Sequence, residues 1–191
     1  MTQCHLRGER FMPSQTFLNL KPEKQARIYA ALLTEFSTYP LANAQVARIV
    51  KDAQIARGAF YKYFMDLADA YQTLWQRALH QLHSQDELAG HLAQTPATYT
   101  QQVRQLLTAG AQQGLRDLLR LHYSTNEAYL GATVHPTTGP HFDAQTWAVM
   151  TLTHQAIKEC LVAPDQEEQI LARLERALTD LMEEKADVSG D

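Results

Sequence analysis

The sequence is poor in cysteine, glycine and proline, and it lacks long hydrophobic runs. Its two cysteines, Cys4 and Cys160, form neither a disulfide framework nor a Cys-x-x-Cys motif. With only 8 glycines and 7 prolines, a loop-rich or collagen-like chain is excluded. No apolar run approaches the roughly 18 residues that a membrane span needs, and the start does not resemble a signal peptide. We therefore expect a cytoplasmic protein in a reducing compartment, with no membrane partner.

What is present indicates a globular, mainly helical protein. Apolar residues make up 45% of the 191 residues and charged residues 20%, which leaves room for one or two domains with proper cores. The net charge of −4 hides an uneven distribution. Residues 1–68 carry nine basic and five acidic side chains, whereas residues 69–191 carry eight and sixteen. This division indicates two functional regions, a basic one followed by an acidic one.

Helical periodicity begins in the basic region. A first helix is predicted from about Pro22 to Ser37, because proline suits the first helical position and apolar residues recur at every fourth position. Tyr39-Pro40 interrupts this helix, and Asn43 is expected to cap a second one that ends near Asp52. A third, short helix is predicted at residues 57–64, with its phenylalanines directed into the core.

These three helices have the size of a helix-turn-helix unit, whose last helix enters the major groove of DNA. Arg57, Tyr61 and Lys62 would line the exposed face of the third helix. Arginine reads guanine edges through paired hydrogen bonds, while lysine and tyrosine hold phosphates. The spacing alone is equally compatible with an ordinary charged surface, because short helical hairpins are common in proteins that never touch nucleic acid.

One segment resembles a known family. Residues 17–71, and above all the run IVKDAQIARGAFYKYF at residues 49–64, resemble the DNA-binding domain of the TetR/AcrR transcriptional regulators. The lead-in Phe-Leu-Asn-Leu at residues 17–20 matches as well, and the most specific part is the Gly-x-Phe-Tyr-x-Tyr-Phe pattern at residues 58–64. The resemblance implies an all-α fold, with an N-terminal three-helix helix-turn-helix domain followed by a helical ligand-binding and dimerisation domain.

The resemblance also implies which residues contact DNA. They lie at matching positions of the second and third helices: Gln45, Arg48, Arg57, Gly58, Ala59, Tyr61, Lys62 and Tyr63. Arg57 is expected to read a base, and Tyr61 and Lys62 to lie near phosphates. Gly58 would let the helix approach DNA closely, because it has no side chain.

Three positions depart from the family pattern. Gln54 replaces the usual turn glycine, and a side chain there costs roughly 1 to 2 kcal/mol if the backbone keeps a positive φ. Ala59 replaces a hydroxyl residue that could contact DNA, and Leu67 stands where a phosphate-binding lysine is common. These changes leave the fold intact, but they weaken the expectation of DNA binding.

We divide the chain into an N-terminal arm at residues 1–20, the helix-turn-helix domain at 21–66, and an effector-binding and dimerisation domain at 67–191. A helix is expected to continue from the first domain into the last through Tyr71, Trp75 and Leu79. Further helices are predicted at about 99–108, 114–123, 143–162 and 165–184, with a loop at 135–140.

The last two helices would form a four-helix dimer interface, as the resemblance implies. The residues expected there are Ile157, Leu174, Leu178 and Leu181. Packing within one subunit explains their apolar spacing equally well. A homodimer suits DNA binding, because two recognition helices about one turn of DNA apart, roughly 34 Å, read a palindromic site.

A small hydrophobic or amphipathic effector would bind among amphipathic and polarisable residues of the acidic region. The candidates are Tyr71, Trp75, His122, Tyr123, Tyr129, Trp147, Met150 and His154. Each of them could instead be an ordinary core residue, and nothing in the sequence identifies the effector.

Other functions have weaker support. His80 and His83 lie on one helix face and could begin a metal site, but other ligands with convincing spacing are absent. No phosphate loop, dinucleotide fingerprint or nucleophile motif is present, so we expect no enzyme activity, no cofactor and no metal. The prediction is a homodimeric transcriptional repressor that a small effector releases from a palindromic operator. The alternative is a TetR-like adaptor or coactivator that binds a protein partner instead of DNA.

Overall fold

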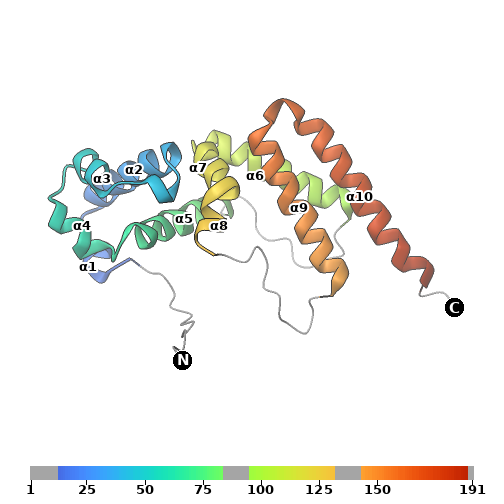
Figure 1. Ribbon diagram of the computed structural model, residues 1–191, viewed down its shortest axis with the longest axis horizontal. Helices are drawn as coiled ribbons and strands as arrows, with labels where there is room; N and C mark the ends of the chain where they lie inside the picture. The colour runs from blue at the N-terminus through green and yellow to red at the C-terminus, as the bar shows by residue number, and fades with distance from the viewer. Residues whose placement is uncertain (1–12, 84–94, 132–142, 189–191) are drawn as a thin grey trace.

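The computed structural model describes residues 13–83, 95–131 and 143–188. Within these ranges the secondary structure is entirely helical, which confirms the expected all-α fold. Figure 1 shows one group of helices, α1 to α4, at one end and the pair α9 and α10 at the other, with α5 extending from the first group toward the middle. None of the described helices is both long and apolar enough to cross a bilayer.

The N-terminal group contains the three expected helices and one more. Its elements are α1 (Gln15–Leu18), α2 (Pro22–Thr38), the 3-10 turn η1 (Leu41–Asn43), α3 (Val46–Asp52) and α4 (Arg57–Tyr63). Phe60 and Phe64 are buried, as predicted. The end of the predicted arm folds onto this group, because Phe17 of α1 is fully buried against Phe64, with ring centroids 5.1 Å apart. Ser14 is attached to the same group, because its hydroxyl donates to the backbone oxygen of Lys62 at 2.8 Å.

The second helix begins later than predicted. Asn43 closes the η1 turn, and Gln45 is the residue that precedes the first turn of α3. The side chain of Gln45 makes no capping hydrogen bond. Its backbone N–H donates instead to the carboxylate of Glu35 on α2, at 2.7 Å. A distant acid thus replaces the local asparagine cap, which the sequence could not reveal.

The long helix α5 (Leu67–His83) joins the two halves. Its first turn is held by a pair of aspartates, since Asp66 accepts from the N–H of Asp69, and Asp69 accepts from the N–H of Met65, both at 2.8 Å. This arrangement is close to the capping box that a polar residue followed three positions later by an acid predicts. From there α5 packs along α2 and then reaches α6.

The C-terminal group is built on long antiparallel neighbours. It comprises α6 (Pro96–Gln112), α7 (Arg116–Leu121), the π-helix η2 (His122–Asn126), α8 (Glu127–Tyr129), α9 (Ala144–Val162), the turn η3 (Pro164–Gln166) and α10 (Glu167–Val188). Thr95 and Asp143 cap α6 and α9 as their sequences suggest. α10 packs against both α9 and α6. The predicted loop at 135–140 lies outside the described residues.

Helices α6 and α7 meet at a glycine. A Cβ atom added to Gly110 would lie 2.6 Å from a methyl carbon of Leu119, so only glycine allows this approach without displacement of the leucine. The contact places α7 against α2, and therefore beside the N-terminal group.

Candidate nucleic-acid interface and effector site

The outer face of α4 carries exposed cations and an exposed aromatic ring. Arg57, Gly58, Tyr61 and Lys62 are all exposed, and the side chain of Tyr61 retains 52% of its accessible surface. Among the described residues neither Arg57 nor Lys62 forms an ion pair with an acid. A side chain at Gly58 would meet no other atom of the protein within 4 Å, so packing does not require glycine there. Ala59 is half-buried beside them.

The side chain of Tyr63 cannot belong to this face. It is 5% exposed and lies in the core, with its ring 5.9 Å from that of Phe17 and 6.4 Å from that of Phe64. The ammonium of Lys24 covers it at 5.7 Å. Residues 60, 63 and 64 share one side of a helix, so Tyr63 follows the buried phenylalanines and not Tyr61. The predicted DNA contact of Tyr63 is therefore wrong for its side chain.

The turn between α3 and α4 has the geometry that the family pattern implied. Gln54 adopts a φ of 53°, the one positive value at a residue other than glycine in the described ranges. The N–H groups of Gln54 and Ile55 return to the carbonyls of Lys51 and Val50, at 3.2 and 3.0 Å, and so close the end of α3. The turn ends α3 and changes the direction of the chain before α4, although Gln54 has a side chain at a position that favours glycine.

The side chain of Arg48 is bound within the protein by a buried acid. Its guanidinium forms several hydrogen bonds to the carboxylate of Glu35, the shortest 2.6 Å long, and its carbon lies 3.9 Å from the ring centre of Tyr39. Glu35 is 3% exposed, and its hydrogen bond to Arg48 raises the pKa of the arginine. The same carboxylate holds the N–H of Gln45, whereas the Gln45 side chain is exposed.

The predicted role of Arg48 as a free DNA ligand does not agree with this geometry. A bidentate arginine and carboxylate pair is strong and directional, so Arg48 and Glu35 fix α3 on α2. Glu35 is a residue that sequence reasoning missed, because an acid in the middle of a helix gives no sign of its partner ten or more residues later.

Leu67, at the position where the family commonly has a phosphate-binding lysine, has an apolar side chain that points inward. Leu67 is half-buried and packs against the core at the first turn of α5. The exposed large side chain in this linker is Met65, which retains 72% of its surface. The α4–α5 junction therefore has an inward leucine at the position where the family pattern has a cation, and an exposed methionine two residues before it.

Five of the predicted effector residues meet between α5, the π-helix and α9. We call them the aromatic–histidine cluster: Tyr71, Trp75, His122, Tyr123 and His154. The Tyr71 hydroxyl and the Nδ1 atom of His122 are 2.8 Å apart, and the rings of Trp75 and His122 stack with centroids 3.5 Å apart. The ring of Tyr123 lies 4.9 Å from that of His154, whose Nε2 is 2.9 Å from the carboxylate of Glu127. The rings pack directly on one another.

Burial keeps the middle of this cluster uncharged. It lowers the pKa of His122 to about 4, with a smaller contribution from His154, so the imidazole is neutral at pH 7. Burial also raises the pKa of Tyr123 to about 12, and it raises that of Tyr71 further. The cluster therefore has a neutral, ring-lined centre with a few polar atoms.

The π-helix η2 connects the cluster to the N-terminal group. His122 begins it and Asn126 ends it. The side-chain oxygen of Asn126 accepts from the backbone N–H of Leu41 in η1, at 2.8 Å, and both residues are buried. The side-chain nitrogen of Asn126 has no partner among the described residues. π-helical turns often occur at functional sites.

Three predicted effector residues lie outside the cluster. Trp147 is 51% exposed and Tyr129 is 62% exposed, while Met150 is half-buried near the start of α9. Neither the ring of Tyr129 nor that of Trp147 stacks on a ring of the cluster in the described structure. The sequence could not separate the two sets, because both contain the same residue types on helices.

The residues predicted at the dimer interface fall into a buried pair and a half-buried pair. Leu174 is 4% exposed and Leu178 is fully buried, so they pack within one subunit, which was the other reading of their spacing. They are therefore not available to a partner. Ile157 and Leu181 are half-buried against the same core. The exposed large apolar residues in the described part of this half are instead Trp147, Leu152 and Val162 on α9 and Tyr129 on α8.

The possible metal site gains no further ligand. Among the described residues no group of three or more His, Cys, Asp or Glu side chains could hold a metal ion. His80 lies exposed on α5, and the side chain of His83 lies outside the description.

Comparison with known proteins defines the fold. No family model and no curated protein matches the sequence. Among solved structures, a TetR family transcriptional regulator from Chloroflexus aurantiacus J-10-FL superposes with a TM-score of 0.53 at 20% identity, over 89% of this chain and 96% of that one. A protein from Streptomyces coelicolor, titled as a transcriptional regulator, gives a TM-score of 0.50 at 20% identity, over 83% and 97%. The chain thus has the fold of TetR-type regulators.

Proposed function

We propose that this protein is a sequence-specific DNA-binding transcriptional regulator. The observation that carries the proposal is the outer face of α4, where Arg57, Tyr61 and Lys62 are exposed and the two cations have no acidic partner among the described residues. This face belongs to a helix-turn-helix in a fold shared with TetR-type regulators. Unpaired cations on such a helix are suited to a polyanion.

Each residue of this face has a distinct task in the proposal. Arg57, at the first position of α4, reads a guanine edge, since the N-terminal end of a recognition helix points into the major groove. Tyr61 and Lys62 hold phosphates on either side of it and so fix the register. The empty space around Gly58 lets the backbone approach the DNA. Arg48 and Glu35 fix α2 to α3, and α3 packs against α4.

A gel-shift titration against the DNA upstream of the gene tests the proposal. The native chain should give a sequence-specific shift that weakens steeply with salt. Arg57→Ala should reduce the affinity by about ten-fold or more and relax the preference at one base pair. Lys62→Gln should weaken binding to all sequences and lower the salt slope by about one.

Two matched variants serve as controls. Arg176→Gln removes an exposed arginine of α10, far from α4, and should leave the shift unchanged. Arg173→Gln, at another exposed arginine of α10, should likewise leave the shift unchanged. Absence of any shift at low and high salt would contradict DNA binding. It would favour an adaptor that binds a protein partner, which the alanine at position 59 and the inward Leu67 would then explain.

The regulator is proposed to respond to a small amphipathic or hydrophobic molecule at the aromatic–histidine cluster. A ligand that separates Trp75 from His122 would disturb the π-helix, and with it the hydrogen bond from Leu41 to Asn126 that reaches the DNA-binding half. Because coupling between two sites is reciprocal, operator DNA should weaken effector binding by the same factor. A molecule found by its ability to abolish the shift should therefore change the fluorescence of Trp75, and a Trp147→Phe background would isolate that signal.

Repression, dimerisation and a cytoplasmic location complete the proposal. Two copies would present two α4 helices to a palindromic operator, and the exposed apolar residues of α9 are the surface that supports such pairing. Binding across a promoter blocks transcription, and the effector then acts by changing the spacing of the two recognition helices.

A further inference from the structure

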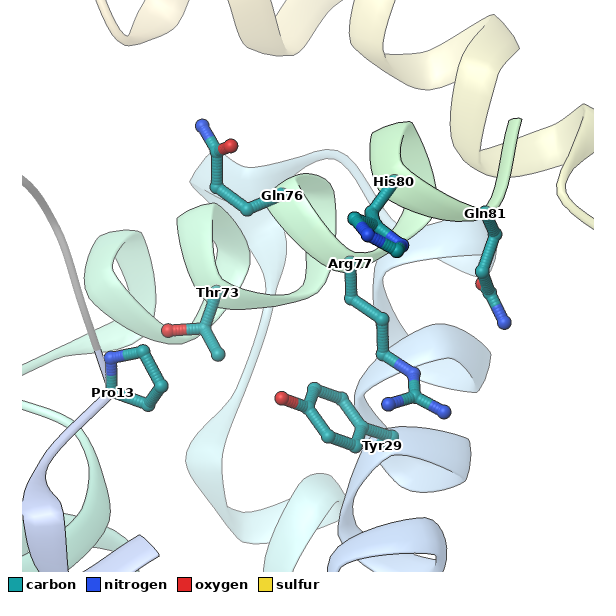
Figure 2. Close-up of a pocket in the computed structure, with 7 residues that line it drawn as sticks. All are labelled: Pro13, Tyr29, Thr73, Gln76, Arg77, His80 and Gln81. Atoms are coloured by element: carbon teal, nitrogen blue, oxygen red, sulfur yellow. The ribbon is translucent and has the colours of Figure 1, made fainter. Parts of the chain in front are cut away.

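A polar groove lies between α2 and α5, away from the aromatic–histidine cluster. Its volume is about 480 Å³, and the residues that define its chemistry are Pro13, Tyr29, Thr73, Gln76, Arg77 and His80. Figure 2 shows Arg77 extending from α5 along the ring of Tyr29 on α2. The size falls within the range of small-molecule sites.

Most of the described residues that line the groove carry hydrogen-bond donors, and none of these described residues is an acid. Arg77 lies over Tyr29, with its guanidinium carbon 4.4 Å from the ring centre, and it has no carboxylate partner in the described ranges. A guanidinium stacked on a ring keeps its in-plane N–H groups for another partner. His80 is exposed one helical turn further along the same side of α5. An anion would therefore find a positive charge with directed donors.

A buried hydroxyl lies at the inner end of the groove. Thr73 is 3% exposed, and its hydroxyl has no hydrogen-bond partner among the described residues. Figure 2 shows the hydroxyls of Thr73 and Tyr29 both turned toward the side of Pro13. Burial raises the pKa of Tyr29 and outweighs the opposing effect of the neighbouring Arg77, and the protonated hydroxyl can donate. An unsatisfied buried polar group in a native fold calls for an explanation, and a bound ligand is one.

This groove and the aromatic–histidine cluster use opposite sides of α5. Residues two positions apart on an α-helix are about 200° apart, so Thr73 and Arg77 point away from Tyr71 and Trp75. A molecule in the groove would touch both α2 and α5 without entering the cluster. The two sites can therefore be occupied and tested independently.

We infer that the groove between α2 and α5 binds a small organic oxyanion with a flat apolar body, such as an aromatic carboxylate. The oxyanion would accept the paired N–H groups of Arg77, and the apolar body would lie between Pro13 and the ring of Tyr29. The amide of Gln76 and the ring of His80 would close the solvent side. The inference does not depend on DNA binding, since it rests on these side chains alone.

Isothermal titration calorimetry of the full chain with benzoate tests this inference. Benzoate should bind saturably, and benzamide, which has the same shape without the charge, should bind at least ten-fold more weakly. Acetate and inorganic phosphate separate the contribution of the ring from that of the charge, and both should bind more weakly than benzoate. Equal binding of benzoate and benzamide, or tighter binding of phosphate, would overturn the inference.

Variants locate the binding to the groove. Arg77→Gln should weaken benzoate binding by about ten- to a hundred-fold, which is the usual range for a hydrogen bond to a charged group. Arg77→Lys keeps the positive charge but loses the paired N–H groups of the guanidinium, so it should weaken binding less than Arg77→Gln. It also provides a check if the glutamine variant folds poorly. Thr73→Val should weaken binding a few-fold without lowering the melting temperature. The control Arg176→Gln should change nothing, and retained benzoate affinity in both Arg77 variants would overturn the assignment.

Discussion

Gln54 holds the sharp turn between α3 and α4 with a φ of 53°, in the left-handed region that side chains rarely adopt. The exposed side chain of Gln54 forms no hydrogen bond that would offset this cost in the described structure. The strain lies directly before the helix that we propose reads DNA. Strained turns of this kind are common beside functional surfaces, where the surrounding packing maintains them.

Gln54→Gly should therefore raise the free energy of unfolding by about 1 kcal/mol. The gain is the relief of the left-handed backbone, reduced by the greater freedom of glycine in the unfolded chain. Urea unfolding followed by circular dichroism measures it. Gln54→Ala is the matched control and should be nearly neutral, because it keeps the same φ. A glycine variant no more stable than the alanine variant would show that the turn is unstrained.

Three arginines show how a residue type acquires different roles. Arg48 is held by a buried acid, Arg57 faces solvent on α4, and Arg77 lies over a tyrosine ring. Only the position of Arg57 could be interpreted from its motif. Glu35 and Tyr29, which decide the roles of the other two, lie 13 and 48 residues away in sequence, and nothing local marks them as partners.

At the scale of single elements, the π-helix η2 is the feature that periodicity did not reveal. The predicted helix at 114–123 is divided into α7 and η2, which follow one another without a break. One extra residue in a turn shifts the side chains that follow by about 100°. The π-turn thereby allows His122 to meet Tyr71 while Asn126 meets Leu41.

The buried His122 should make stability depend on pH. Its pKa is about 4 in the folded protein and about 6.5 when unfolded, so below pH 6.5 the unfolded chain binds a proton that the folded chain cannot. Stability should therefore fall as the pH is lowered from 6.5 to 4, by about 3 kcal/mol from this residue, and it should be unaffected by His122 above that window.

Unfolding free energies of the native chain and of His122→Gln at pH 7.5, 5.5 and 4.5 measure this contribution. Both proteins contain the same other titratable groups, so the difference between their pH profiles reports His122. The native chain should lose more stability than the variant on acidification. Parallel profiles would show that His122 is not buried in its neutral form.

The apolar stripe of α10 was predicted as a stripe but not assigned to a side. Leu174 and Leu178 face α9 and α6 within the subunit, because both neighbours pack on α10. A periodic apolar pattern predicts that one side of a helix is buried, but it does not indicate whether the same subunit or a second subunit covers that side. Exposed large apolar residues lie instead on the neighbouring helix α9, at Trp147, Leu152 and Val162.

At the scale of the whole molecule, pairing of two subunits should depend on α9. Trp147, Leu152 and Val162 are exposed apolar residues on that helix. Tryptophan residues in the centre of an interface commonly contribute about 2 kcal/mol or more. Trp147→Glu should therefore raise the dimer dissociation constant at least ten-fold in sedimentation velocity experiments, and should weaken operator binding in parallel.

Leu18→Glu is the matched control, because Leu18 is 44% exposed on α1 in the other half of the molecule. It should leave the association state unchanged. An unchanged dissociation constant in Trp147→Glu would remove α9 as the pairing surface. A monomer at all concentrations would contradict the homodimer itself.

The sequence by itself determined the longer helices, the buried phenylalanines Phe60 and Phe64, and the exposed face of Arg57, Tyr61 and Lys62, whereas the turn at Gln54 was expected only from the family resemblance. These features depend on spacing within a few residues, where helix geometry decides which side chains share a side. Only the tertiary structure decided that Arg48 serves Glu35, that Tyr63 and Leu178 are interior, and that Asn126 holds the N–H of Leu41. Those contacts join residues 13 to 85 positions apart, and a buried polar group takes whichever partner the packing of helices brings within reach.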